Sequence, residues 1–360
     1  MRERNYSLEL LRVTAMLGVV ILHIGGGIAP LCIRENKIII RLVLALFYCS
    51  VDIFALLSGF LKYNKKNKTS SLLNILFTMF FWSFLITCSL ILFMRSSVGI
   101  REIITYALPF VGGRLWYISC YTFAFFVFPL INKLLEVLEQ EIYKKFLFIS
   151  FIFLSVICTF GVKDYFNCVS NGYSSVWLLW CYATGGYLGK YLQIEKIPRI
   201  SVLLPLLIVN NIIMVISTFF VEILFSFLEK KPTDTYLYIL YRYNSPFTVL
   251  NTLLIIFIIL KFIKIECSGA QKIVRWLSSV SLGVYVIHAH PFFLDKVFVV
   301  RNLEWLLKGG TFLFLVKLFI FSFCVYLLTG FLEYIRQRVF RVLKVDVLIT
   351  IIGNKIDKKL

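Results

Sequence analysis

Three ionisable residues lie in the first long apolar stretch of the chain, and they share one face if that stretch is a helix. Arg12 and His23 are eleven residues apart, almost three helical turns or about 16 Å along the axis. Glu9 precedes Arg12 by three residues and lies on the same side. An imidazole can act as a base near neutral pH, and a guanidinium can bind an anion. We therefore interpret His23, Arg12 and Glu9 as candidate catalytic residues.

Each of these residues also has a simpler interpretation. Glu9 and Arg12 fit an ion pair that anchors the helix at the membrane surface. His23 fits a hydrogen bond between two helices. Their common face favours the functional interpretation, because ionisable side chains within a membrane segment are costly and usually functional.

Asp52, in the next apolar stretch, is a further catalytic candidate. It fits a charge partner for Arg12 or His23 in an active cavity, and it fits a hydrogen bond between helices equally well. If Asp52 meets His23, it would orient the base as the carboxylate does in a catalytic triad.

Two more segments carry candidate substrate-binding residues. Tyr285 and His288 share a helical face late in the chain, whereas His290 is turned to another side. This spacing does not suit a two-histidine metal site, so we expect no bound metal. Arg114 could face an anionic or sugar ligand beside two aromatic residues that also fit the interfacial belt of a membrane protein, Trp116 and Tyr117.

The composition shows which elements must position these residues. The chain has 360 residues, of which 60% are hydrophobic and 16% are charged, and its mean hydropathy is +0.87. Soluble domains carry about 25% charged residues, so the composition excludes a soluble enzyme, a disordered chain and a fibrous protein. Long unbroken apolar runs predict an all-α polytopic membrane protein instead of a membrane barrel.

We expect about ten membrane-spanning helices without an internal soluble module. Their approximate ranges are 7–30, 38–61, 72–94, 115–135, 146–162, 175–192, 200–228, 247–266, 273–294 and 311–335. The sixth contains Gly185, Gly186 and Gly189, which would allow close helix packing. Residues 1–335 would form the membrane domain, and residues 336–360 a basic tail at the membrane surface, held by anionic lipid.

The formal net charge of +19 is explained by topology. With the N-terminus inside, most of the 38 Lys and Arg residues fall in cytoplasmic segments, so we expect both termini to be cytoplasmic. No nucleic-acid-binding motif is present, and we expect no nucleic-acid partner. The nine cysteines include no Cys-x-x-Cys pair and are interpreted as small buried apolar residues.

Four segments together resemble the membrane acyltransferase family 3, in the family's order. They are residues 7–12 with His23, residues 51–60, residues 115–117 with Pro129 and Asn132, and residues 281–288. The chain departs from the family in having Arg114 where a histidine is common. It also has lysines in place of the usual arginine-rich stretch after the second helix, namely Lys62, Lys65, Lys66 and Lys68.

The resemblance implies a multi-pass enzyme of the bacterial inner membrane that moves an acyl group, usually acetyl, from cytoplasmic acetyl-CoA. The acceptor would be a hydroxyl of a cell-surface or lipid-linked sugar, as in O-antigen, capsule or exopolysaccharide. The chain resembles the stand-alone form of the family, without a hydrolase-like domain. Acetyl-CoA is then a substrate, and no bound cofactor is expected.

His23 would either activate the sugar hydroxyl for direct transfer, which we favour, or carry the acetyl group transiently. The alternative function is a transporter or flippase of a lipid-linked saccharide. Such proteins usually show repeated halves with broken helices in matching places, and no clear internal repeat is visible in this chain.

Overall fold

The computed structural model describes residues 5–94, 99–109, 113–161 and 169–359, which form helices and connecting turns without any strand. Seven helical segments in this part of the chain are long and apolar enough to cross a membrane. They are Tyr6–Leu31, Arg34–Lys62, Thr69–Phe93, Trp116–Val137, Gln140–Phe160, Ile200–Phe227 and Thr311–Val342. The protein is therefore an all-α polytopic membrane protein, as the composition predicted.

The other three expected spans are also helical, but they are shorter or more polar. They are α9 (Ser175–Tyr191), α12 (Pro246–Phe262) and α13 (Ser268–His288). Apart from the C-terminal α16 (Val345–Asp357), the elements outside these spans are short connecting helices, with 3₁₀ or π turns between several of them. They are α5 (Ile100–Ala107), α11 (Asp234–Leu237) and α14 (Val300–Leu303). Ten spans are reached only if these three helices α9, α12 and α13 cross the membrane as well as the seven longer segments.

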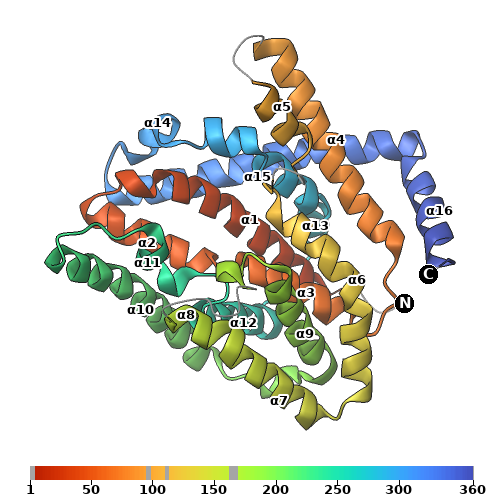
Figure 1. The fold of residues 1–360 in the computed structure, drawn as a ribbon, viewed down its shortest axis with the longest axis horizontal. Helices are drawn as coiled ribbons and strands as arrows, with labels where there is room; N and C mark the ends of the chain where they lie inside the picture. Colours follow the sequence, from red (N-terminus) through yellow and green to blue (C-terminus); the bar gives the residue numbers. More distant parts are fainter. Residues whose placement is uncertain (1–4, 95–98, 110–112, 162–168, 360) are drawn as a thin grey trace.

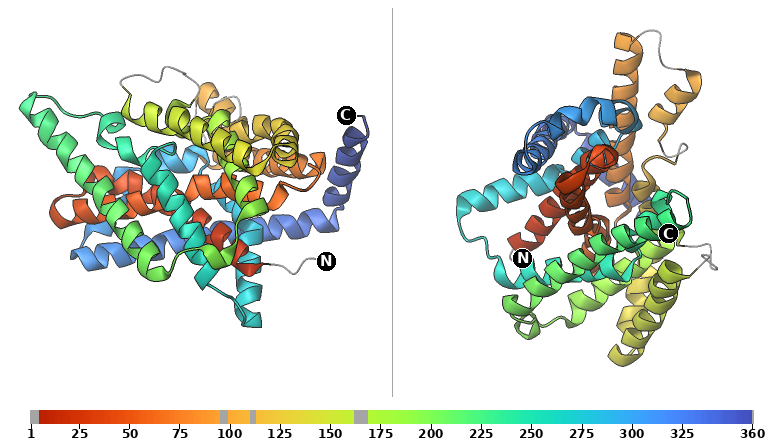
Figure 2. Two further views of the ribbon diagram at one scale, coloured as in Figure 1. Left: turned by 90° about the horizontal axis from the view of Figure 1, so that it is seen from below. Right: turned by 90° about the vertical axis from the view of Figure 1, so that its left-hand side faces the viewer.

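Helix α1 (Tyr6–Ile28) lies inside the bundle, which explains why polar residues on it can form a site. Figures 1 and 2 show α1 surrounded by helices that are distant in the sequence. It packs most extensively against α13, and then against α3 (Ser50–Lys62) and α15 (Thr311–Val342). The face of α1 that carries His23 and Glu9 is therefore met by protein and not by lipid.

The second expected span, 38–61, is not one continuous helix. It consists of α2 (Arg34–Phe47) and α3 (Ser50–Lys62), separated by a break at Tyr48 and Cys49. The break places Asp52 in the first turn of α3, where the positive end of the helix dipole favours a carboxylate. Hydrophobicity alone gave no sign of this break.

Helices α3 and α9 pack together closely, as the glycines of the sixth span predicted. A Cβ atom at Gly59 would overlap the carbonyl oxygen of Tyr182, and one at Gly185 would overlap that of Leu56. Glycine is required at both positions because two helix backbones meet there. This packing fixes α3, and with it Asp52, against α9.

The C-terminal segment is helical throughout its described part. Helix α15 continues across residue 335 to Val342, and α16 (Val345–Asp357) folds back from it to lie beside α4 (Thr69–Met94). The turn between them contains Lys344 in a left-handed conformation, with φ of 56°. The expected boundary between membrane domain and tail therefore falls inside a helix.

Candidate active site

The two histidines that the sequence placed on separate helices meet where α1 and α13 pack together. His23 Nδ1 lies 3.0 Å from His288 Nε2. The other ring nitrogen of His288, Nδ1, lies 2.5 Å from the carbonyl oxygen of Val284, one turn earlier on α13. The three groups form a continuous hydrogen-bonded chain.

The backbone carbonyl at the end of this chain determines which nitrogens carry protons. A carbonyl oxygen only accepts, so His288 Nδ1 must donate to Val284. In a neutral His288, Nε2 is then an acceptor, and His23 Nδ1 must donate to it. His23 Nε2 is left with a free lone pair, which is the requirement for a general base.

The two imidazoles differ in exposure, and the proposed base is the more exposed of the two. His288 is buried, with 1% of its surface exposed, whereas His23 is partly exposed. His23 can therefore meet a substrate, and His288 can hold its ring from behind. The sequence assigned His288 to substrate binding, but the structure places it against the candidate base.

His290 is separate from this pair, as the helical spacing predicted. Its Nε2 lies 3.1 Å from the carbonyl oxygen of Tyr106, and its Nδ1 accepts the backbone N–H of Phe292. Its tautomer is therefore opposite to that of His288. No cluster of three metal-ligating side chains occurs within the described ranges.

Glu9, Arg12 and His23 form a polar stripe along α1, and its N-terminal end holds the charged pair that the sequence indicated. Arg12 Nη1 donates to Glu9 Oε2 over 3.3 Å, and Ser278 Oγ of α13 donates to the same carboxylate oxygen. Glu9 is nearly buried, but the Arg12 side chain is 37% exposed. The carboxylate therefore anchors Arg12 while leaving most of its donors available.

Asp52 is not brought to His23 by any hydrogen bond in the described structure. Its Oδ1 accepts the indole N–H of Trp177 over 3.0 Å, and the thiol of Cys181 is 3.8 Å away. The residue is 1% exposed, and its second oxygen, Oδ2, has no partner among the described residues. Of the two interpretations left open by the sequence, the observed contacts match a bond between helices α3 and α9.

An aromatic cluster extends from the histidine pair. Tyr285 lies beside His288, with ring centroids 6.3 Å apart, and it also meets Tyr117 edge-on at 6.3 Å. Trp116 stacks on Tyr243 at 5.6 Å. The ring centroid of Tyr173 lies 4.7 Å from that of Trp116 and 4.8 Å from that of Tyr243. The candidate binding residues Trp116, Tyr117 and Tyr285 thus form one surface with two tyrosines that the sequence analysis did not single out.

Arg114 has a protein partner at the surface. Its Nη2 donates to Asp295 Oδ2 over 2.9 Å, and both side chains are substantially exposed. This ion pair joins the start of α6 (Trp116–Val137) to the segment after α13. The observed contact supports a structural tie, and substrate binding by Arg114 stays a prediction.

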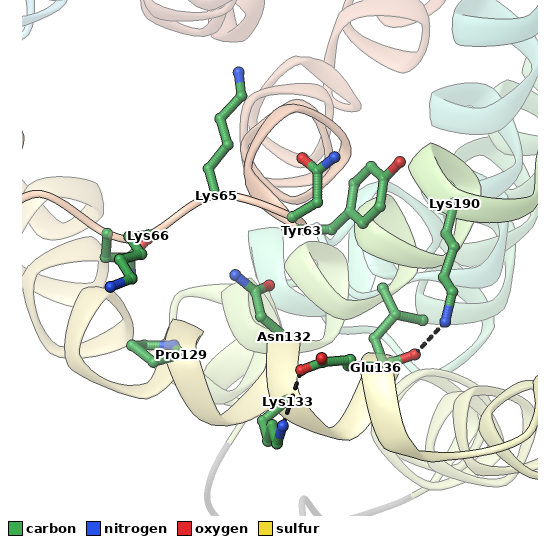
Figure 3. Close-up of a pocket in the computed structure, with 11 residues that line it drawn as sticks. Tyr63, Lys65, Lys66, Pro129, Asn132, Lys133, Glu136 and Lys190 are labelled. Atoms are coloured by element: carbon green, nitrogen blue, oxygen red, sulfur yellow. Dashed lines mark hydrogen bonds and ion pairs between the residues drawn. The ribbon is translucent and has the colours of Figure 1, made fainter.

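A basic pocket of about 640 Å³ opens at the opposite end of the bundle from the aromatic cluster along α6. It is lined by the turn after α3, the last turns of α6 and the end of α9, as Figure 3 shows. Four lysines contribute to it, namely Lys65, Lys66, Lys133 and Lys190. Two of them stand in the lysine stretch that replaces the arginines of the family motif.

The four lysines are not equally available. Lys190 Nζ donates to the carbonyl of Leu135 over 2.6 Å, and Lys133 is paired with Glu136 at 3.0 Å. Lys65 and Lys66 have no side-chain partner within the described chain. The pocket therefore presents two uncommitted ammonium groups beside several amide side chains.

A search with protein-family models returns one family, described as an acyltransferase domain, whose match covers residues 5–331. The fold is that of a polytopic all-α membrane protein, and two histidines are paired between α1 and α13. The chain belongs to the membrane acyltransferase family 3. Searches of curated proteins and of solved structures return no significant match.

Proposed function

We propose that this membrane acyltransferase transfers an acetyl group from acetyl-CoA to a hydroxyl of a cell-surface or lipid-linked sugar, such as O-antigen, capsule or exopolysaccharide. The observation that carries the proposal is the bond chain from Val284 through His288 to His23. It supplies a partly exposed neutral imidazole, held in the tautomer needed to take a proton from an alcohol.

In the proposed reaction, His23 Nε2 removes the proton of the sugar hydroxyl while its oxygen attacks the thioester carbonyl. A new C–O bond forms, the C–S bond breaks, and the CoA thiolate recovers the proton from the His23 imidazolium. His288 stabilises that imidazolium through the bond to His23 Nδ1, in the role that the carboxylate plays in a triad.

An acetyl-histidine route would use the same nitrogen as a nucleophile. Both routes need the lone pair on His23 Nε2, so both depend on His288. We favour direct transfer because the partly exposed ring lets an acceptor hydroxyl approach the same atom. Sequential kinetics with two substrates would support direct transfer, whereas ping-pong kinetics would support the acetylated intermediate.

The basic pocket and Arg12 support the donor side of the proposal. Acetyl-CoA carries several phosphates, and the uncommitted amines of Lys65 and Lys66 offer charge-assisted bonds to them. By the distribution of basic loops, this pocket and Arg12 both face the cytoplasm. The guanidinium of Arg12 would then contact the donor on its way toward His23.

The aromatic cluster supports the acceptor side. Sugars present apolar faces that pack on aromatic rings, while their hydroxyls bond to phenol and indole groups. His23 lies 17 residues into α1 from Tyr6, about 25 Å along the helix, and so stands nearer the outer end. An acceptor arriving from outside the inner membrane would reach the base past Trp116 and Tyr117.

The proposal is tested by comparing surface glycan from strains with and without the gene. We expect NMR to show loss of an O-acetyl signal, and mass spectrometry a loss of about 42 Da for each modified sugar, the mass of an acetyl group replacing hydrogen. A strain carrying His290→Ala should retain the modification. Loss of the whole polymer, with no acetyl difference, would contradict the proposal and indicate transport.

A further inference from the structure

A second polar cleft, of about 380 Å³, lies between α4, the end of α15 and α16. Ser70 and Asn74 of α4 form one wall, and Arg336 and Arg341 of α15 form another. Asp346 at the start of α16 completes it. The lining side chains from α15 and α16 lie beyond residue 331, where the family match ends, whereas the wall from α4 lies within the match.

Arg336 is buried at the base of the cleft and is held with two of its nitrogens engaged. Its Nε and Nη2 donate to the two oxygens of Glu333 over 2.8 and 2.6 Å. Trp82 and Gln337 donate to the same carboxylate. The third nitrogen, Nη1, has no partner among the described residues, although Arg336 is only 6% exposed. A buried N–H group without an acceptor is costly, so a ligand in this cleft that offers an oxygen to Nη1 would gain a hydrogen bond.

The cleft also contains one basic and one acidic side chain without an ion-pair partner among the described residues. Neither Arg341 nor Asp346 makes an ion pair or a side-chain hydrogen bond with another described side chain. By contrast Arg338, one helical turn away, is bonded to the hydroxyl of Tyr334 over 2.8 Å. A simple anion would meet repulsion from Asp346, but a ligand with both a phosphate and an ammonium would satisfy both groups.

Helix α16 fixes the shape of this cleft. Its Asp357 accepts hydrogen bonds from the backbone N–H and the hydroxyl of Thr69 at the start of α4. A Cβ atom at Gly353 would overlap the backbone of Ser70, so the two helices are in direct contact. The walls are therefore built by packed helices, as Figures 1 and 2 show for the C-terminal end of the chain.

Apolar side chains border the polar cleft. Val339 and Val342 of α15 and Val347 and Leu348 of α16 are each about half exposed or more. Because α15 is a membrane-spanning candidate, exposed apolar side chains at its end and on the adjoining α16 are suited to contact with lipid tails. A polar cleft beside a lipid-facing apolar surface fits an amphiphile and not a free nucleotide.

We propose that this cleft binds the headgroup of an inner-leaflet phospholipid that carries a phosphodiester and a primary ammonium. The phosphate accepts hydrogen bonds from Arg336 Nη1 and Arg341, and the ammonium donates to Asp346. This binding does not depend on acyl transfer.

The test is native mass spectrometry of the full-length protein with matched phosphatidylethanolamine, phosphatidylglycerol and phosphatidylcholine. We expect phosphatidylethanolamine to be retained about tenfold more than the other two, since charge-assisted bonds of this kind change affinity by that order. Arg341→Gln should abolish the preference. Asp346→Asn should shift it toward phosphatidylglycerol, because the repulsion of a net negative headgroup is removed. Arg338→Gln is the matched control and should behave as the wild type.

Several results would overturn the proposal. Equal retention of the three lipids would remove the headgroup preference, and unchanged binding in both Arg341→Gln and Asp346→Asn would place the lipid elsewhere. Displacement of the bound lipid by added CoA at stoichiometric amounts would assign the cleft to the donor's phosphates. The two substituted side chains are exposed, so folding is preserved and is checked by size-exclusion elution.

Discussion

The two ends of the polar stripe on α1, formed by Glu9, Arg12 and His23, differ in how their side chains are paired. At the N-terminal end, Glu9 and Arg12 form an ion pair, and the arginine remains more than a third exposed. Toward the C-terminal end of the helix, His23 is bonded to another imidazole and, through it, to a backbone carbonyl. The first end holds a pair of opposite charges, and in the proposed resting state the second holds none.

This difference follows from the cost of charge in a low-dielectric environment. Removing an ion pair from water costs free energy. A pair of neutral, hydrogen-bonded imidazoles avoids this cost and becomes charged only during the proposed reaction. Val284 can fix the tautomer without adding a charge. A carboxylate in the place of His288 could also orient His23, as in a catalytic triad, but it would add a charge that is costly to bury.

The largest effect is expected from His23→Ala. Removal of a general base costs about 10² to 10⁴ in rate, so the O-acetyl content of surface glycan should fall below detection while the protein still inserts. Membrane levels are measured by immunoblot. Normal acetylation with this substitution would remove His23 from the mechanism.

His288→Ala should cost about 10- to 100-fold in rate, less than loss of the base itself, because His23 remains but its tautomer is no longer fixed. His288→Gln should recover part of the activity, since its amide oxygen can accept the His23 proton. His290→Ala is the matched control, because that ring is equally buried but bonded elsewhere. An equal loss in His290→Ala would show that the effect is structural.

At the inner end, Arg12→Lys should lower kcat/KM for acetyl-CoA about tenfold or more, mainly through KM, because an ammonium cannot reproduce the planar fork. Arg275→Lys, an exposed residue on α13, is the control. Kinetics are measured in membranes with labelled acetyl-CoA. Wild-type values for Arg12→Lys would reduce Arg12 to an anchor.

Asp52→Asn should have a much smaller effect, within about threefold in rate, or about 0.7 kcal/mol. The amide oxygen can still accept the Trp177 indole, and no hydrogen bond to His23 is lost in the described structure. A loss as large as that of His288→Ala would restore Asp52 as the group that orients the base.

The assignment of inner and outer ends is tested at Cys267, in the exposed turn between α12 and α13. The backbone N–H groups of Ala270 and Gly269 lower the pKa of this thiol below its usual value. Its thiolate fraction, and so its reaction with a membrane-impermeant maleimide, is raised at neutral pH and falls as the pH is lowered. We expect the labelling that is lost in Cys267→Ser to occur from the cytoplasmic side alone. If that part of the labelling occurred from outside, the two ends would be reversed.

The sequence predicted the fold well because hydrophobicity is a local property. Each expected span is largely helical in its described part, although the second is divided into α2 and α3. The glycines that bring α3 and α9 together were visible in the sixth span. The break before Asp52 was missed, because Tyr48 and Cys49 are neither glycine nor proline. The tail was expected as an interfacial segment, which stays a prediction. The structure adds that α16 is a helix packed on α4.

The candidate site was predicted in parts but not as an assembly. Helical spacing placed His23 and His288 on polar faces and turned His290 away, because those relations lie within one helix. The bond between His23 and His288 depends on how α1 and α13 cross, over 265 residues of sequence. Ser278 and Trp177, the partners of Glu9 and Asp52, have no distinguishing sequence signal because a serine and a tryptophan are ordinary residues in membrane helices.

The central claim is that His23 presents an unprotonated Nε2 because His288 fixes its tautomer, and ¹⁵N NMR of histidine-labelled protein tests it most directly. The chain has only three histidines, and His290→Ala removes one signal pair for assignment. We predict that His23 and His288 carry their protons on Nδ1, while His290 carries its proton on Nε2. A protonated Nε2 on His23 in the resting protein would contradict the account.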